Sequence, residues 1–137
     1  MDEIPEAFWL GVEQFNQRQF YDCHDTLEAI WTEAETSDKN FYQGILQVAV
    51  ALYHLRNLNW QGAVVLMGEG VNRLRAYQPE HYTIDVEQFL ADTVALLRDI
   101  QQAGPEAVAA IAQRLETPDP DRPIAPLPHL ATVPPAA

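Results

Sequence analysis

The chain has 137 residues and an apolar fraction of 47%, which suits one compact, folded domain. Its 8 Lys and Arg residues stand against 20 Asp and Glu residues, and the resulting net charge of −12 argues against a nucleic acid partner. The single cysteine, Cys23, excludes an internal disulfide and indicates a reducing compartment. We find no targeting segment and no apolar stretch near the ~20 residues that span a bilayer. We therefore expect a cytoplasmic protein without a membrane partner.

Apolar residues recur at helical spacing along most of the chain. This periodicity predicts helices over roughly 5–16, 18–34, 39–57, 60–77, 84–102 and 105–116. The third predicted helix has no charged side chain between Phe41 and Leu55, which is typical of a helix that other helices surround. Asn59 is expected to cap the fourth helix. Glycine lowers helix propensity, so a close approach of another backbone is expected in the fourth helix at Gly62, Gly68 and Gly70.

The composition changes at Thr117. Seven of the ten prolines lie between Pro118 and Pro135, without apolar periodicity, so we expect a proline-rich tail over 117–137 that is extended or disordered. Residues 1–116 are predicted to form a helical bundle domain. The predicted fold class is all-α, a compact bundle of about five to six helices.

The second and third predicted helices carry an unusual set of polar residues. His24 lies on the apolar stripe of its helix, so its imidazole is predicted to face the core, with Glu28 one turn further on. On the third helix, Gln43, Gln47 and His54 fall within one narrow angular sector. Burial of such groups without partners is costly, so we expect them to be hydrogen-bonded to one another or bound to a ligand.

Two interpretations of this polar cluster stay open. In the first, the cluster binds a small ligand or a divalent metal inside the bundle and supports a hydrolase-like activity, with Asp25 or a water completing the metal coordination. In the second, it is a hydrogen-bond network that fixes the register of the helices. The candidate catalytic residues are His24, Asp25 and Glu28, the candidate metal ligands are His24, Glu28 and His54, and the candidate cofactor-binding residues are Gln43 and Gln47.

Other reactive side chains carry no predicted chemistry. Cys23 does not face His24, because adjacent helix positions diverge by about 100°, and it is expected to be a small core residue. Ser37 lacks the glycine-rich elbow of a serine hydrolase. His81 and His129 are expected in a loop and in the tail, without a role.

Characteristic sequences in the first half of the chain occur in a familiar order. Residues 24–31 read H-D-T-L-E-A-I-W, residues 42–54 read Y-Q-G-I-L-Q-V-A-V-A-L-Y-H, and Gly62-Ala63 follows. This order resembles the helical family catalogued as domain of unknown function 309, over roughly residues 8–74. The resemblance implies a compact bundle in which the histidine and acids of the second helix meet the glutamines of the third, and it implies no established activity. That family usually has Glu directly after the histidine, where this chain has the shorter Asp25.

A different class of function is a non-catalytic interaction or oligomerisation module. Ten of the twenty acids lie in the first 40 residues, and the glycine-bearing fourth helix and the proline-rich tail offer further contact surfaces. The partner would then be another protein or a second copy of the chain. The polar cluster would be structural in that case.

Overall fold

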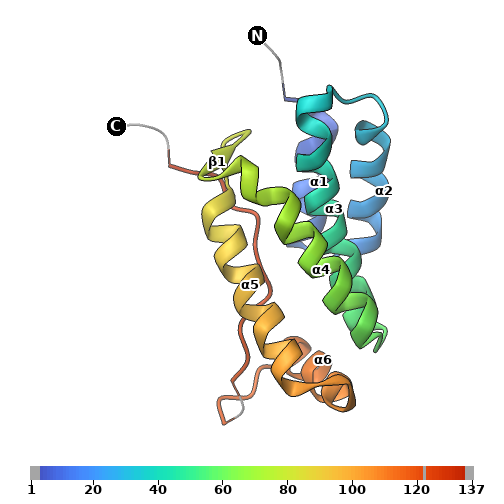
Figure 1. Ribbon diagram of the computed structural model, residues 1–137, viewed down its shortest axis with the longest axis vertical. Helices are drawn as coiled ribbons and strands as arrows, with labels where there is room; N and C mark the ends of the chain where they lie inside the picture. Colours follow the sequence, from blue (N-terminus) through green and yellow to red (C-terminus); the bar gives the residue numbers. More distant parts are fainter. Residues whose placement is uncertain (1–3, 122, 135–137) are drawn as a thin grey trace.

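The computed structural model describes residues 4–121 and 123–134, which form helices and one short β-hairpin (Figure 1). The helices are α1 (Glu6–Asn16), α2 (Phe20–Trp31), α3 (Thr36–Arg56), α4 (Trp60–Leu74), α5 (Val86–Ala103) and α6 (Val108–Glu116). The single-turn 3-10 helices η1 (Arg75–Tyr77) and η2 (Pro105–Ala107) follow α4 and precede α6. Strands β1 (Glu80–His81) and β2 (Ile84–Asp85) pair antiparallel. The predicted all-α fold class is confirmed.

Helix α3 lies at the centre of the packing. It packs against α2 and against α4, while α1 packs against α2 and α5 packs against α4. Eleven residues of α3 are buried, which confirms that its uncharged segment is surrounded by other parts of the molecule. Figure 1 shows α6 at the end of α5 that is remote from the hairpin. Among the described residues, no helix is long and apolar enough to cross a membrane.

Glycine allows α3 and α4 to approach each other closely. A Cβ atom on Gly70 would lie 2.8 Å from the carbonyl oxygen of Gly44, and a Cβ atom on Gly44 would lie 2.6 Å from the side chain of Leu74. The predicted close approach of backbones is therefore found at Gly70. A Cβ atom on Gly62 would meet side chains instead, and one on Gly68 would have no neighbour within 4 Å.

Two helices are followed by a residue in the left-handed conformation that is not glycine. Arg18 follows α1 with φ of 65°, and Leu58 follows α3 with φ of 64°. At both places the amide of the next residue donates to the carbonyl oxygen five residues earlier at 2.8 Å, as in a Schellman motif. Asn59 then caps α4 as predicted, because its side chain accepts a hydrogen bond from the Gly62 amide at 2.9 Å.

The proline-rich segment returns along the helices in an extended conformation (Figure 1, red). Leu130 is buried, and its backbone makes two hydrogen bonds to the Asn16 side chain, which donates at 2.9 Å and accepts at 2.8 Å. Thr132 forms a β-bridge with Ile84 of the hairpin. The segment is therefore held against α1 at Leu130 and against the hairpin at Thr132. The two predicted units also include residues 1–3, 122 and 135–137, which lie outside the described residues.

Candidate functional site

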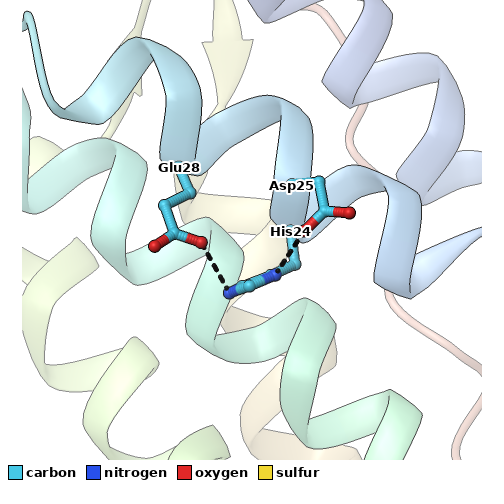
Figure 2. A group of neighbouring side chains, drawn as sticks. All are labelled: His24, Asp25 and Glu28. Atoms are coloured by element: carbon cyan, nitrogen blue, oxygen red, sulfur yellow. Dashed lines mark ion pairs between the residues drawn. The ribbon is translucent and has the colours of Figure 1, made fainter.

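Three side chains on α2 form a group of potential metal ligands, shown in Figure 2. His24 Nε2 lies 3.3 Å from Glu28 Oε2, and His24 Nδ1 lies 3.3 Å from Asp25 Oδ1. One ligand atom from each residue lies within 4.8 Å of the others. Glu28 reaches the imidazole because residues four apart share one face of a helix. The two carboxylates therefore bracket the ring, one at each nitrogen.

This group, the α2 cluster (His24, Asp25 and Glu28), lies at the surface of the molecule. The side chains of Asp25 and Glu28 are 60% and 56% exposed, whereas that of His24 is 27% exposed. The imidazole is therefore half-buried rather than enclosed in the core. Its Nδ1 atom is shielded from solvent, and the approach of Asp25 does not have the geometry of a hydrogen bond. The Nδ1 atom is therefore a buried polar atom whose hydrogen bond is not made in this structure.

Gln47 belongs to a separate network between α3 and α4. Its amide nitrogen donates to Glu69 Oε2 at 3.0 Å, and its amide oxygen accepts from Arg73 Nε at 3.0 Å. Arg73 also donates to Asn40 Oδ1 at 2.7 Å. Gln47 is buried, so these bonds satisfy both ends of an amide that would otherwise be costly to bury. Its observed contacts tie α3 to α4.

The other two predicted site residues on α3 are half-buried. His54 Nδ1 lies 3.4 Å from the side-chain nitrogen of Asn59, near the end of the helix. Gln43 precedes Gln47 by one turn on the same side of α3. Within the part of the chain that the structure describes, the group of potential metal ligands holds His24 but does not include His54. The predicted site residues thus separate into the α2 cluster and the polar side of α3.

A second polar cluster, which no sequence pattern predicts, joins the start of α3 to the hairpin. Asp38 accepts a hydrogen bond from the Tyr82 hydroxyl at 2.8 Å, and Asp38 Oδ1 lies 3.0 Å from His81 Nε2. The Tyr42 hydroxyl lies 3.0 Å from that of Tyr82. The His81 ring stacks on Tyr82, with 4.6 Å between centroids, and meets the edge of Phe41 at 4.5 Å. We call these five residues the hairpin cluster.

The hairpin cluster keeps its phenols protonated. Burial, reinforced by the hydrogen bonds to Tyr42 and Asp38, raises the pKa of Tyr82 well above its ordinary value. Burial also raises the pKa of Tyr42. No local pattern predicts the hairpin that carries His81 and Tyr82. Its turn residues Tyr82 and Thr83 have φ of 53° and 63°, without the Gly or Asn that is typical of such a turn.

The fold and the site define an all-helical protein with a histidine and two carboxylates grouped on its second helix. Residues 8–66 match the family model described as Domain of unknown function (DUF309), which confirms the resemblance over that stretch. The chain is similar to the uncharacterized protein YpuF of Bacillus subtilis (strain 168), with 39% identity over 83 residues. That match covers 59% of this chain and 46% of YpuF, so the chain spans less than half the length of this relative. No solved structure matches the chain.

The matched stretch ends within α4. It includes the α2 cluster and all the predicted site residues on α3. It does not include the hairpin, α5, α6 or the proline-rich segment. The α2 cluster therefore lies in the part of the chain that matches the family, and the hairpin cluster depends on residues outside it.

Proposed function

We propose that the α2 cluster binds a divalent metal ion and that the bound ion gives the protein a hydrolase-like activity. The observation that supports this most is the grouping of one imidazole and two carboxylates within 4.8 Å. The distance of 3.3 Å between His24 Nε2 and Glu28 Oε2 suits two ligands that each lie about 2.0–2.2 Å from one ion. Nitrogen and oxygen ligands together suit zinc and its first-row neighbours.

The geometry supports different roles for the two carboxylates. An imidazole binds an ion through one nitrogen, and the other nitrogen commonly donates to a carboxylate that orients the ring. Glu28 approaches Nε2 and Asp25 approaches Nδ1. In our proposal His24 Nε2 and Glu28 hold the ion. Asp25, which does not hydrogen-bond to Nδ1 in this structure, would accept a hydrogen bond from Nδ1–H when the ion binds and so position the ring.

The exposure of the cluster supports a catalytic role for the ion. Two protein ligands leave coordination positions for water and for a substrate. A divalent ion lowers the pKa of a bound water from 15.7 to about 7, which supplies hydroxide at neutral pH. The exposed Asp25 and Glu28 side chains place such a water within reach of substrates in solution. In the same proposal the Gln43 amide on α3 contacts the substrate, and the compartment in which the protein acts is the cytoplasm.

Metal analysis of the full chain tests this proposal. The protein is purified without a His tag and without chelators, and its metal content is measured by mass spectrometry together with zinc titration by calorimetry. We expect about one equivalent of bound ion in the wild type, little in His24→Ala, and an unchanged content in Asp22→Asn, an exposed acid on α2 outside the cluster. A folded wild type that neither carries nor binds an ion would contradict the proposal.

The second candidate is an interaction module, and exposed apolar side chains favour it. Tyr21 on α2 is 56% exposed, and Leu10 on α1 is 50% exposed. The Tyr21 ring also contacts those of His24 and Tyr53, at 5.9 and 5.4 Å between centroids. The partner would be a protein or a second copy of the chain, and the α2 cluster would then serve structure. Light scattering on Tyr21→Ser tests this candidate, because a changed oligomeric state with unchanged metal content would favour the module.

A further inference from the structure

A groove made of two adjoining cavities lies beside α6, at the ends of α1 and α3. The first cavity has a volume of about 340 Å³ and is lined by the buried side chains of Phe20, Leu52 and Leu55. The second has a volume of about 350 Å³ and lies between α6 and the returning segment, at residues 118–120 and 123–127. Leu115 and Leu127 line both cavities, so the two adjoin at these side chains, and we treat them together as the groove. Mainly apolar cavities of about 300–1,000 Å³ are typical of small-molecule sites.

The groove is lined by more basic than acidic side chains, although the chain as a whole is strongly acidic. Among the described residues, Arg18, Arg56 and Arg114 line it, three of the 8 basic residues of the chain. Glu116 and Asp119 also line it, two of the 20 acidic residues. The balance of charge in the groove is therefore opposite in sign to that of the whole protein.

The three arginines differ in what they contact. Arg56 Nε lies 3.7 Å from Glu116, so its charge is already matched. Arg18 donates to the Leu115 carbonyl oxygen at 3.5 Å, and Arg114 donates to the Ala110 carbonyl oxygen at 3.3 Å. Within residues 4–121 and 123–134, neither of these two guanidinium groups forms an ion pair with a carboxylate. Arg18 and Arg114 thus have charge available for an anion.

Two residues that line the groove have strained backbones. Arg18 and Leu58 occupy the left-handed position after α1 and α3, where glycine is the favoured residue. The Leu58 side chain is 53% exposed, so burial does not explain its presence there. Residues with strained backbones cluster at active sites and ligand sites, where the position of the side chain serves the function. In this groove Leu58 adds apolar surface and Arg18 adds a cation.

We propose that this groove binds a small anionic amphiphile, a carboxylate on a medium-length hydrocarbon chain, of which decanoate is the probe. The hydrocarbon chain lies against Leu52, Leu55 and Leu58, and the carboxylate pairs with Arg18 and Arg114. A neutral apolar ligand would leave these two guanidinium groups without a counter-charge. A large polyanion would be repelled by the net charge of −12.

Titration of the full chain with three probes of equal chain length tests the ligand class. Decanoate, decanol and decyltrimethylammonium are compared by calorimetry and by amide NMR shifts, below their micelle concentrations. We expect saturable binding of one decanoate with shifts confined to the groove, at least tenfold weaker binding of decanol, and no binding of the ammonium. Equal affinity for decanol, binding without saturation, or a dimer that buries the groove would overturn the proposal.

Variants test the residues, with matched controls elsewhere in the chain. Arg18→Gln and Arg114→Gln should each weaken decanoate binding about tenfold, because each removes a charge-assisted contact. Arg98→Gln, an exposed arginine on α5 outside this groove, should leave it unchanged. If both groove variants bind decanoate as the wild type does, the proposal fails.

Leu58→Gly separates a ligand contact from a structural role. The substitution removes the side chain and relieves the left-handed backbone, so the melting temperature should hold or rise while decanoate binding weakens severalfold. Val65→Ala, at a residue that is 50% exposed on α4, should change neither quantity. A lower melting temperature with unchanged binding would show that Leu58 is structural and would overturn its part in the site.

Discussion

The two carboxylates of the α2 cluster differ in the ring nitrogen that each approaches, and metal affinity should reveal the difference. Glu28→Gln removes the charge of the proposed ligand and should lower zinc affinity by more than about 100-fold. Asp25→Asn keeps an acceptor beside Nδ1 and should cost about tenfold. Zinc titration by calorimetry measures both changes, with Asp22→Asn as the control. The reverse order would place the ion at Nδ1 and make Asp25 the ligand.

The same residues show what the sequence predicts about the site. The contact between His24 and Glu28 could be predicted because i, i+4 spacing on a helix brings side chains together. The partners of Gln47 could not, because Glu69 lies 22 residues further along the chain. A shared angular sector does not say how far apart two side chains lie along the helix axis. Gln43 and His54 are eleven positions apart, which corresponds to about 16 Å of rise. That length explains why residues in one sector of α3 need not meet the same ligand.

Burial of Cys23 makes the free energy of unfolding depend on pH in the alkaline range. Burial raises the pKa of this thiol from 9.0 to about 12. Between these values the unfolded chain loses a proton that the folded chain keeps. The contribution of the thiol to the free energy of unfolding is therefore fully present below about pH 9 and is lost as the pH rises. Urea unfolding at pH 8 and pH 10 should show a loss from this thiol of about 1.4 kcal/mol.

Cys23→Ala is the control for this pH dependence. The variant lacks the thiol but keeps Tyr42 and Tyr82, whose raised pKa values act in the same direction at alkaline pH. The loss between pH 8 and pH 10 should therefore be smaller in Cys23→Ala than in the wild type. Equal losses in both proteins would show that the thiol does not titrate as its burial implies.

The contact between α3 and α4 can be tested with two glycines of α4. Gly70→Ala forces a Cβ atom to within 2.8 Å of the Gly44 carbonyl oxygen and should lower the free energy of unfolding by about 1–3 kcal/mol. Gly68→Ala meets nothing within 4 Å and should raise it by up to about 1 kcal/mol. Urea denaturation measures both values, and a gain in stability for Gly70→Ala would contradict the close packing.

Helices were predictable from the sequence because the apolar periodicity that defines them is local. The apolar periodicity predicts the start of α3 near residue 39, whereas the structure begins it at Thr36 without a side-chain cap. Asp38 lies in that first turn and binds the hairpin instead. The hairpin itself was not predicted, since its turn at Tyr82 and Thr83 uses positive φ without glycine. Both details involve contacts between residues more than 40 positions apart, which a local sequence pattern does not contain.

Asn16 joins the first helix to the proline-rich segment, near the other end of the chain. Asn16→Ala removes both hydrogen bonds to the Leu130 backbone and leaves partly buried polar groups, so we expect a loss of about 1–3 kcal/mol. Urea unfolding measures the loss, and faster hydrogen exchange at the Leu130 amide locates it. Asn72→Ala, at an exposed position on α4, should change neither. Unchanged exchange in Asn16→Ala would show that other contacts hold the segment.

The amino-acid composition of this segment predicts its conformation but not its position in the fold. Its prolines predict an extended chain, because proline removes the amide that a helix needs. They do not predict where it docks, since Leu130 meets a side chain 114 residues away. The groove beside α6 depends on the same docking, because Leu127 lines both of its cavities. No local pattern in the sequence contains that information.

The long reach of the bond between Asn16 and Leu130 has a consequence for the order of folding. Contacts between α1 and α2, α2 and α3, and α3 and α4 join neighbours in the chain, and local contacts form rapidly. Closing a loop of 114 residues carries a larger entropic cost and gains little until the helices are in place. The helices are therefore expected to assemble first, and the proline-rich segment to dock last on a surface that they have already built.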